Sequence, residues 1–196
     1  MASELASREP THLGSSVHTA VKILVVGHFG VGKTTFVGSI SEIRPLRTEE
    51  VITQASTGVD DLSGTPDKTT TTVAMDFGRL TLSDTVVLYL FGTPGQQRFK
   101  QLWEDLSHGA LGALLLIDPE RLDRSFEILD LVEQYGLPVA VGVNHFDGSS
   151  SYDMDEVREA LNLTADVPVV PCDVRERKAA ADTLITLVEY LHSRTR

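Results

Sequence analysis

Hydrophobic residues occur in short blocks along most of this chain, and segments with helical periodicity separate the blocks. Residues 21–26 contain five apolar side chains in six positions and predict a buried strand. A helix is expected directly afterwards, over residues 34–40. Strands that are apolar nearly throughout are typical of a parallel sheet covered by helices on both faces, so the pattern favours an α/β domain.

The blocks farther along the chain predict the remaining elements. Further strands are expected at residues 73–80, 86–91, 110–117, 138–143 and 167–170, and the first two form a hairpin. Further helices are expected at residues 125–135, 153–161 (capped by Asp153) and 176–192. A polar region at 42–71 has the length of a functional or mobile loop. Residues 1–19 predict a flexible tail, and residues 20–196 a single domain.

The first predicted strand ends at a glycine-rich segment, which reads Gly27-His28-Phe29-Gly30-Val31-Gly32-Lys33-Thr34 and continues with Thr35. It fits the pattern G-x-x-x-x-G-K-[ST], in which backbone N–H groups and a helix N-terminus surround a phosphate. The Lys33 ammonium is expected to reach the β- and γ-phosphates, and the Thr34 hydroxyl to ligate Mg²⁺. The segment therefore predicts a site for a nucleoside triphosphate.

A second glycine-containing turn follows the strand at 86–91. In P-loop GTPases such a turn places a glycine N–H on the γ-phosphate and a glutamine beside the attacking water. Gly95 and Gln96 suit these two roles. A turn with an incidental glutamine is the alternative for this segment taken alone.

The strand at 138–143 leads into a candidate base-reading loop. Its residues Asn144, His145 and Asp147 resemble the guanine-reading pattern N-K-x-D. The Asp147 carboxylate would accept the N1–H and exocyclic amine of guanine, which adenine cannot offer. Asn144 would tie this loop to the phosphate loop, and His145 would stack on the base. Cys172 and Asp173 follow the last strand, where a backbone N–H is expected to contact the guanine oxygen, although a buried structural cysteine is an alternative for Cys172.

In kind and order, these motifs resemble Ras-like small GTPases over residues 20–193. The resemblance implies a three-layer P-loop NTPase fold, α/β with a mostly parallel central sheet and one antiparallel strand. Residues 68–78 (K-T-T-T-T-V-A-M-D-F-G), F-G-T-P-G-Q-Q-R-F and V-N-H-F-D-G resemble more narrowly the actinobacterial conservon (CvnD) GTPases, which belong with the bacterial polarity GTPase MglA. This implies a GTP/GDP switch in bacterial signalling, with a roadblock-fold regulator and a membrane histidine-kinase-like protein as partners.

The metal site departs from the Ras-like pattern. Gly92 stands where most such proteins have an aspartate that holds Mg²⁺ through water. Asp76 is the candidate replacement, against the alternative of a solvent-facing strand aspartate. Thr72 is the candidate for the switch hydroxyl on Mg²⁺, and Thr71 or Thr70 could serve if the register differs.

The positively charged residues that could assist GTP hydrolysis also differ from the Ras-like pattern. Phe29 would crowd an arginine that arrives from a partner, and Thr71 stands where MglA-type proteins carry their own arginine. Lys68 is not equivalent to a planar guanidinium, and Arg98 would have to rearrange. Slow intrinsic hydrolysis, with Gln96 and Lys33 as the catalytic groups, is therefore expected. A nucleotide-dependent binding module with negligible turnover remains the alternative, and a P-loop kinase is disfavoured by the base-reading loop.

Composition limits the classes of binding partner and the cellular compartment that we expect for this protein. The 196 residues carry a formal net charge of −11, which disfavours a nucleic-acid surface. Cys172 is the only cysteine, so a reducing cytoplasm is expected. No signal peptide, lipidation motif or apolar run of bilayer length is found, so we expect no direct membrane anchor and recruitment to membranes only through a partner.

Overall fold

The computed structural model of this chain describes residues 16–48, 75–94, 100–148 and 150–194. The strands are β1 (Thr19–Val26), β2 (Leu46–Thr48), β3 (Met75–Thr81), β4 (Val86–Gly92), β5 (Gly112–Ile117), β6 (Val139–Asn144) and β7 (Val169–Cys172). The helices are α1 (Lys33–Ile40), α2 (Lys100–Ser107), α3 (Phe126–Gln134), α4 (Met154–Ala160) and α5 (Arg177–Ser193), with a 3-10 segment at Pro119–Ser125.

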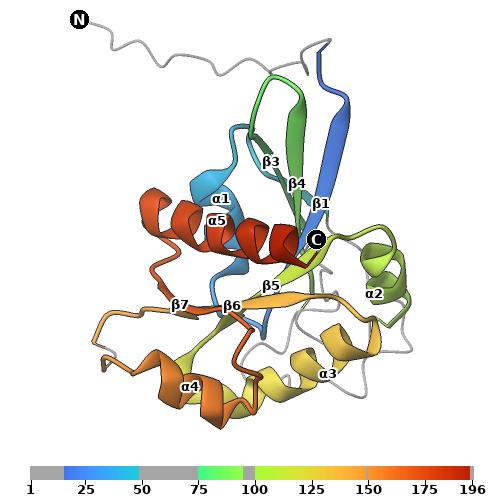
Figure 1. Cartoon of the computed structure of the whole chain (residues 1–196). Helices are drawn as coiled ribbons and strands as arrows, with labels where there is room; N and C mark the ends of the chain where they lie inside the picture. Colours follow the sequence, from blue (N-terminus) through green and yellow to red (C-terminus); the bar gives the residue numbers. More distant parts are fainter. Residues whose placement is uncertain (1–15, 49–74, 95–99, 149, 195–196) are drawn as a thin grey trace, which may run out of the picture.

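The strands form one sheet in the order β2-β3-β4-β1-β5-β6-β7 (Figure 1). β1 pairs in parallel with β4 and β5, and β5, β6 and β7 continue in parallel. β3 is antiparallel to both of its neighbours, β2 and β4. A mostly parallel sheet with one antiparallel strand confirms the predicted fold class.

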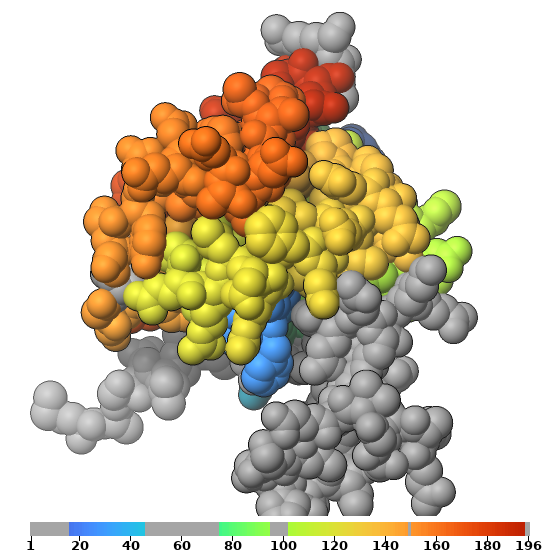
Figure 2. Space-filling view, turned by 90° about the horizontal axis from the view of Figure 1, so that it is seen from below, coloured from blue at the N-terminus to red at the C-terminus, as the bar shows by residue number. Residues whose placement is uncertain are grey.

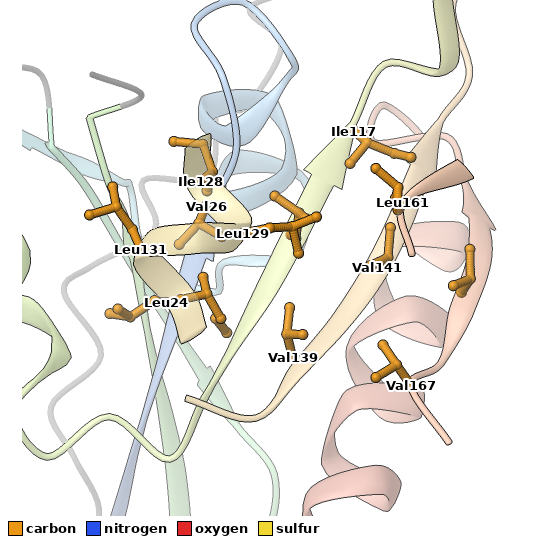
Figure 3. Close-up of a cluster of buried hydrophobic side chains, with 14 of the residues drawn as sticks. Leu24, Val26, Ile117, Ile128, Leu129, Leu131, Val139, Val141, Leu161 and Val167 are labelled. Atoms are coloured by element: carbon orange, nitrogen blue, oxygen red, sulfur yellow. The ribbon is translucent and has the colours of Figure 1, made fainter. Parts of the chain in front are cut away.

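Helices cover both faces of the sheet. Successive side chains along a strand point to opposite faces, so each face has its own hydrophobic core packed against helices. Ile23 and Val25 pack with α1 and α5, while Leu24 and Val26 pack with α2, α3 and α4. Figure 3 shows Ile128 and Leu129 of α3 against this second face of the sheet. The predicted three-layer arrangement is therefore present.

Several elements differ from the sequence prediction. β1 begins two residues earlier and β5 two residues later than expected, and the 3-10 segment was not predicted. β2 lies inside the region predicted as a loop, and α2 was not predicted. β7 begins at Val169, two residues later than expected, where pairing with Val141 of β6 starts. Asp153 caps α4 as predicted, because its carboxylate accepts hydrogen bonds from the N–H groups of Asp155 and Glu156.

Because β4, β1, β5, β6 and β7 are neighbouring parallel strands, their carboxyl ends lie at one edge of the sheet. Because β3 runs the opposite way, its first residues reach the same edge, where Asp76 pairs with Gly92. This edge of an α/β sheet is where ligands ordinarily bind.

Candidate functional site

The phosphate loop connects β1 to α1 and needs glycine at two positions. Gly27 and Gly32 have φ angles of 144° and 107°, in the region that side chains rarely adopt. A Cβ at Gly27 would lie 2.4 Å from the Leu116 carbonyl oxygen, and one at Gly32 would lie 2.9 Å from Val174 Cγ2. The loop therefore packs closely against two neighbouring strand ends, with α1 beginning directly behind it.

Lys33 folds back over this loop. Its Nζ donates hydrogen bonds to the carbonyl oxygens of Gly27 (2.7 Å) and His28 (2.8 Å). Burial lowers the pKa of Lys33 to about 8, and the Asp76 carboxylate opposes that shift. An anion placed in the loop would favour the charged ammonium, so the arrangement suits a polyphosphate.

The side chains of His28 and Phe29 diverge at the loop apex. His28 is buried, and its Nδ1 donates to the Phe29 carbonyl oxygen over 2.7 Å. Burial also lowers the pKa of His28, which favours the neutral ring. The Phe29 side chain is 82% exposed, so it lies where a bound partner could touch it.

Thr34 and Asp76 come together although 42 positions separate them in the sequence. Thr34 Oγ1 donates to Asp76 Oδ2 over 2.5 Å, and Asp76 is only 4% exposed. A Cβ at Gly92 would lie 3.1 Å from Asp76 Cβ and 3.2 Å from Asp76 Oδ2. The Asp76 carboxylate thus fills the space beside Gly92, and the expected strand-surface alternative for Asp76 is wrong.

A hydroxyl and a carboxylate beside a phosphate loop are hard oxygen donors of the kind that Mg²⁺ prefers. These residues therefore fit the expected metal. Within the described ranges, no three His, Cys, Asp or Glu side chains gather as a metal site.

Asn144 joins three loops at the end of β6. Its Nδ2 donates to the Val31 carbonyl oxygen of the phosphate loop over 2.9 Å, which is the tie that the sequence predicts. Its Oδ1 accepts from the Val174 N–H after β7 over 3.2 Å. Asn144 is 2% exposed, so these bonds are made out of water. They hold the phosphate loop and the expected base loops in one arrangement.

The two other residues of the base-reading loop are accessible. His145 is exposed, and its N–H donates to the Cys172 carbonyl oxygen over 2.9 Å. The Asp147 side chain is 89% exposed. Both side chains are thus within reach of a ligand at this edge.

Cys172 is the last residue of β7 and does not follow it as expected, and only Asp173 reaches the site by its side chain. The Cys172 thiol is buried in the core with α1 and α5, and burial raises its pKa. Asp173 instead pairs with Arg175, and Arg175 also contacts Asp147. Sequence reasoning missed Arg175, because only the fold brings the loops after β6 and β7 together.

Several expected site residues lie outside the described part of the chain. They are Thr72 with its alternatives Thr70 and Thr71, and also Lys68, Gly95, Gln96 and Arg98. Their roles remain predictions. Thr35 is exposed in the first turn of α1, directly after Thr34.

Figure 2 views the molecule from the carboxyl edge of the sheet. The phosphate-loop region (blue) comes to this surface beside the 3-10 segment and α3 (yellow). None of the helices in the described ranges has the length and apolar character needed to cross a membrane.

Comparison with known proteins gives one family. Residues 25–194 match the model of a family described as conserved hypothetical ATP binding protein. An uncharacterized protein of Methanocaldococcus jannaschii is 30% identical over 144 residues, which are 72% of this chain and 80% of that protein.

Solved structures of similar fold include G domains of FeoB iron transporters. The Thermotoga maritima domain is 18% identical, with a TM-score of 0.60 over 87% of this chain and 98% of that one. The Methanococcus jannaschii domain is 14% identical, with a TM-score of 0.59 over 89% of this chain and 99% of that one. These likenesses concern the fold.

Proposed function

This chain belongs to the family described as conserved hypothetical ATP binding protein, and from that premise we propose that it is a small GTP-binding protein. It would alternate between GTP and GDP states as a bacterial signalling switch and hydrolyse GTP slowly. The observation that carries the proposal is a pair of buried hydrogen bonds: Asn144 donates to the Val31 carbonyl oxygen and accepts from the Val174 N–H, which joins the phosphate loop to the base loops.

Guanine is proposed in preference to the adenine of the family's description because of Asp147. A carboxylate can accept two hydrogen bonds but cannot donate, so it matches the N1–H and amine of guanine and opposes the N1 acceptor of adenine. The FeoB cytosolic domain, solved in a GDP form, shares this fold with a TM-score of 0.64 at 17% identity, over 90% of this chain and 65% of that one. That likeness is consistent with the proposal.

Magnesium would be held by Thr34 and Asp76 together with the nucleotide, and Thr72 is the proposed switch ligand. When bound, Mg²⁺ would neutralise charge on the phosphates. The Thr34–Asp76 hydrogen bond supports this assignment because it holds the two oxygens next to each other, where one cation could contact both.

Competition binding tests the proposed nucleotide directly. GTP, GDP and ATP would each displace a fluorescent guanine nucleotide from the full chain in Mg²⁺ buffer. GTP and GDP should bind at least about 30-fold more tightly than ATP, since a charge-assisted pair of hydrogen bonds that the bound base shields from water is worth about 2–3 kcal/mol. Equal affinities for GTP and ATP would instead support the adenine specificity of the family's description.

Hydrolysis is the second part of the proposal. We predict single-turnover rates on the order of 10⁻² s⁻¹ or slower, by analogy with unassisted switches. The Gln96→Leu variant should hydrolyse GTP more slowly than the parent while its GTP affinity stays within about twofold, because glutamine acts on the attacking water. A measurable rate that is unchanged in this variant would refute the proposed role of Gln96, whereas negligible turnover by the parent would favour the alternative of a binding module.

The proposed partners are a roadblock-fold regulator and a membrane histidine-kinase-like protein, with the chain itself in the cytoplasm. The support for them is the motif resemblance to conservon and MglA-type GTPases. A roadblock-fold partner that accelerated single-turnover hydrolysis would strengthen this part of the proposal, and one that left it unchanged would count against it.

A further inference from the structure

Arg175 joins the two carboxylates at the base-reading end of the site. Its Nε and Nη2 donate to Oδ1 (2.9 Å) and Oδ2 (2.7 Å) of Asp173, so the guanidinium grips that carboxylate as a fork. Its Nη1 donates to Asp147 Oδ1 over 2.8 Å. One side chain from the loop after β7 therefore fixes a side chain from the loop after β6.

The two carboxylates differ in how firmly they are held. Asp173 Oδ1 also accepts the backbone N–H of Arg175 over 3.0 Å, and the Asp173 carbonyl accepts the N–H of Glu176 over 3.0 Å. The Asp173 side chain is 23% exposed, whereas that of Asp147 is 89% exposed. Asp173 thus holds the Arg175 guanidinium in place. Arg175 in turn donates a hydrogen bond to Asp147 from a fixed position.

The charges of the cluster reinforce this geometry. Arg175 lowers the pKa of Asp173 to about 2. The two carboxylates in turn raise the pKa of Arg175. Asp173 and Arg175 therefore stay ionised over the pH range of nucleotide-binding assays, and the guanidinium offsets the repulsion between the carboxylates of Asp147 and Asp173.

We infer that Arg175 is a positioning residue for base recognition: it sets the orientation of the Asp147 carboxylate that reads guanine. This inference rests on the proposed function. Arg175 contacts one oxygen of Asp147, and each carboxylate oxygen accepts more than one hydrogen bond, so the guanine edge can be received while the contact persists. Orienting an exposed side chain beforehand reduces the entropy lost on binding.

A double-mutant cycle separates this role from a general structural one. Affinities for GTP would be measured by competition for the parent, Arg175→Ala, Asp147→Ala and the double variant. Arg175→Ala should weaken GTP binding about 3- to 10-fold in the parent, the size expected for one side chain left unoriented. In the Asp147→Ala background the same change should alter GTP affinity less than about twofold, because there is no carboxylate to orient.

Three further variants sharpen the test. Arg175→Lys keeps the charge without the fork and should recover only part of the affinity. Asp173→Ala should weaken GTP binding and add little to Arg175→Ala. Lys178→Ala removes a cation that pairs with Asp182 and is 88% exposed, so it controls for net charge and should leave GTP affinity unchanged.

The outcomes distinguish this inference from the proposed function. A parent protein that prefers GTP, combined with equal losses from Arg175→Ala in both backgrounds, overturns the inference alone. Tighter GTP binding by Arg175→Ala also overturns it, because Arg175 would then compete with the base for Asp147. A parent without preference for GTP over ATP overturns the proposed guanine specificity and this inference together.

Discussion

At the residue scale, the carboxylate beside the proposed metal position comes from β3, whereas most Ras-like proteins carry it at the position of Gly92 on β4. Gly92 has no side chain, and the Asp76 carboxylate occupies the adjacent space from the paired position on β3. Sequence reasoning could propose Asp76 because it is a carboxylate near the switch threonines. The contact with Thr34 depends on strand pairing across 42 positions, which no local pattern contains.

Replacing Asp76 tests the metal assignment. Asp76→Ala should raise the Mg²⁺ concentration needed for half-maximal GTP binding about 10- to 100-fold, the usual effect of losing a supporting carboxylate. Adding Gly92→Asp to that variant should bring the required Mg²⁺ concentration part of the way back to the parent value, since the two Cβ positions lie 3.1 Å apart. Gly92→Asp alone is the control and should lower thermal stability by placing two carboxylates together. An unchanged Mg²⁺ requirement in Asp76→Ala would exclude Asp76 from the metal site.

Lys33 predicts a pH dependence of nucleotide binding. In the free protein its pKa is about 8, and a bound polyphosphate should raise it again. GTP affinity should therefore be highest below about pH 8 and fall above it. Binding of GTP should be accompanied by proton uptake at Lys33, roughly three-quarters of a proton at pH 8.5 and about a tenth at pH 7. Calorimetry in two buffers with different ionisation enthalpies measures this uptake. Binding without proton uptake at pH 8.5 would contradict the assignment.

At the element scale, the loops that follow β1, β6 and β7 form one unit through Asn144. Asn144→Ala removes two buried hydrogen bonds and should lower the free energy of unfolding by about 1–3 kcal/mol. It should also weaken the binding of GTP and of GDP alike, because the proposed contacts of these loops are with the parts that both nucleotides share. Thermal unfolding and competition binding are the measurements.

Asn162→Gly is a matched control for that variant. Asn162 is exposed with a φ of 53°, which glycine adopts without strain, and it lies beside the start of β6. Its replacement should leave nucleotide affinity unchanged. If Asn144→Ala behaves like this control, the loops are held together by other contacts.

The helices other than α2 were predicted most accurately, each within one residue at both ends, because their apolar periodicity is a local signal. β1 and β5 in the described structure differ from prediction by two residues at their starts and agree at their ends. α2 was missed because its apolar residues, among them the fully buried Trp103, are few in a polar segment. β2 and the start of β7 depend on pairing with a neighbouring strand, which a one-dimensional pattern does not contain.

At the scale of the whole molecule, candidate site residues from distant parts of the sequence lie together at one edge of the sheet. The phosphate loop and Asn144 could be predicted because their motifs are local and follow apolar strands. Arg175 could not, since its role arises only where two loops meet. The switch residues Thr72 and Gln96 lie outside the described ranges and remain predictions.

The central claim is that Asp147 reads guanine, and exchanging its carboxylate for an amide tests this most directly. The amide introduced by Asp147→Asn can donate one hydrogen bond and accept another, which suits the carbonyl and N1–H of xanthine. Competition titrations of GTP, XTP and ATP against the parent and Asp147→Asn give the comparison. We predict a loss of about 30- to 1000-fold in GTP affinity and a preference for XTP in the variant. An Asp147→Asn variant that keeps the parent's affinities for all three nucleotides would contradict the claim.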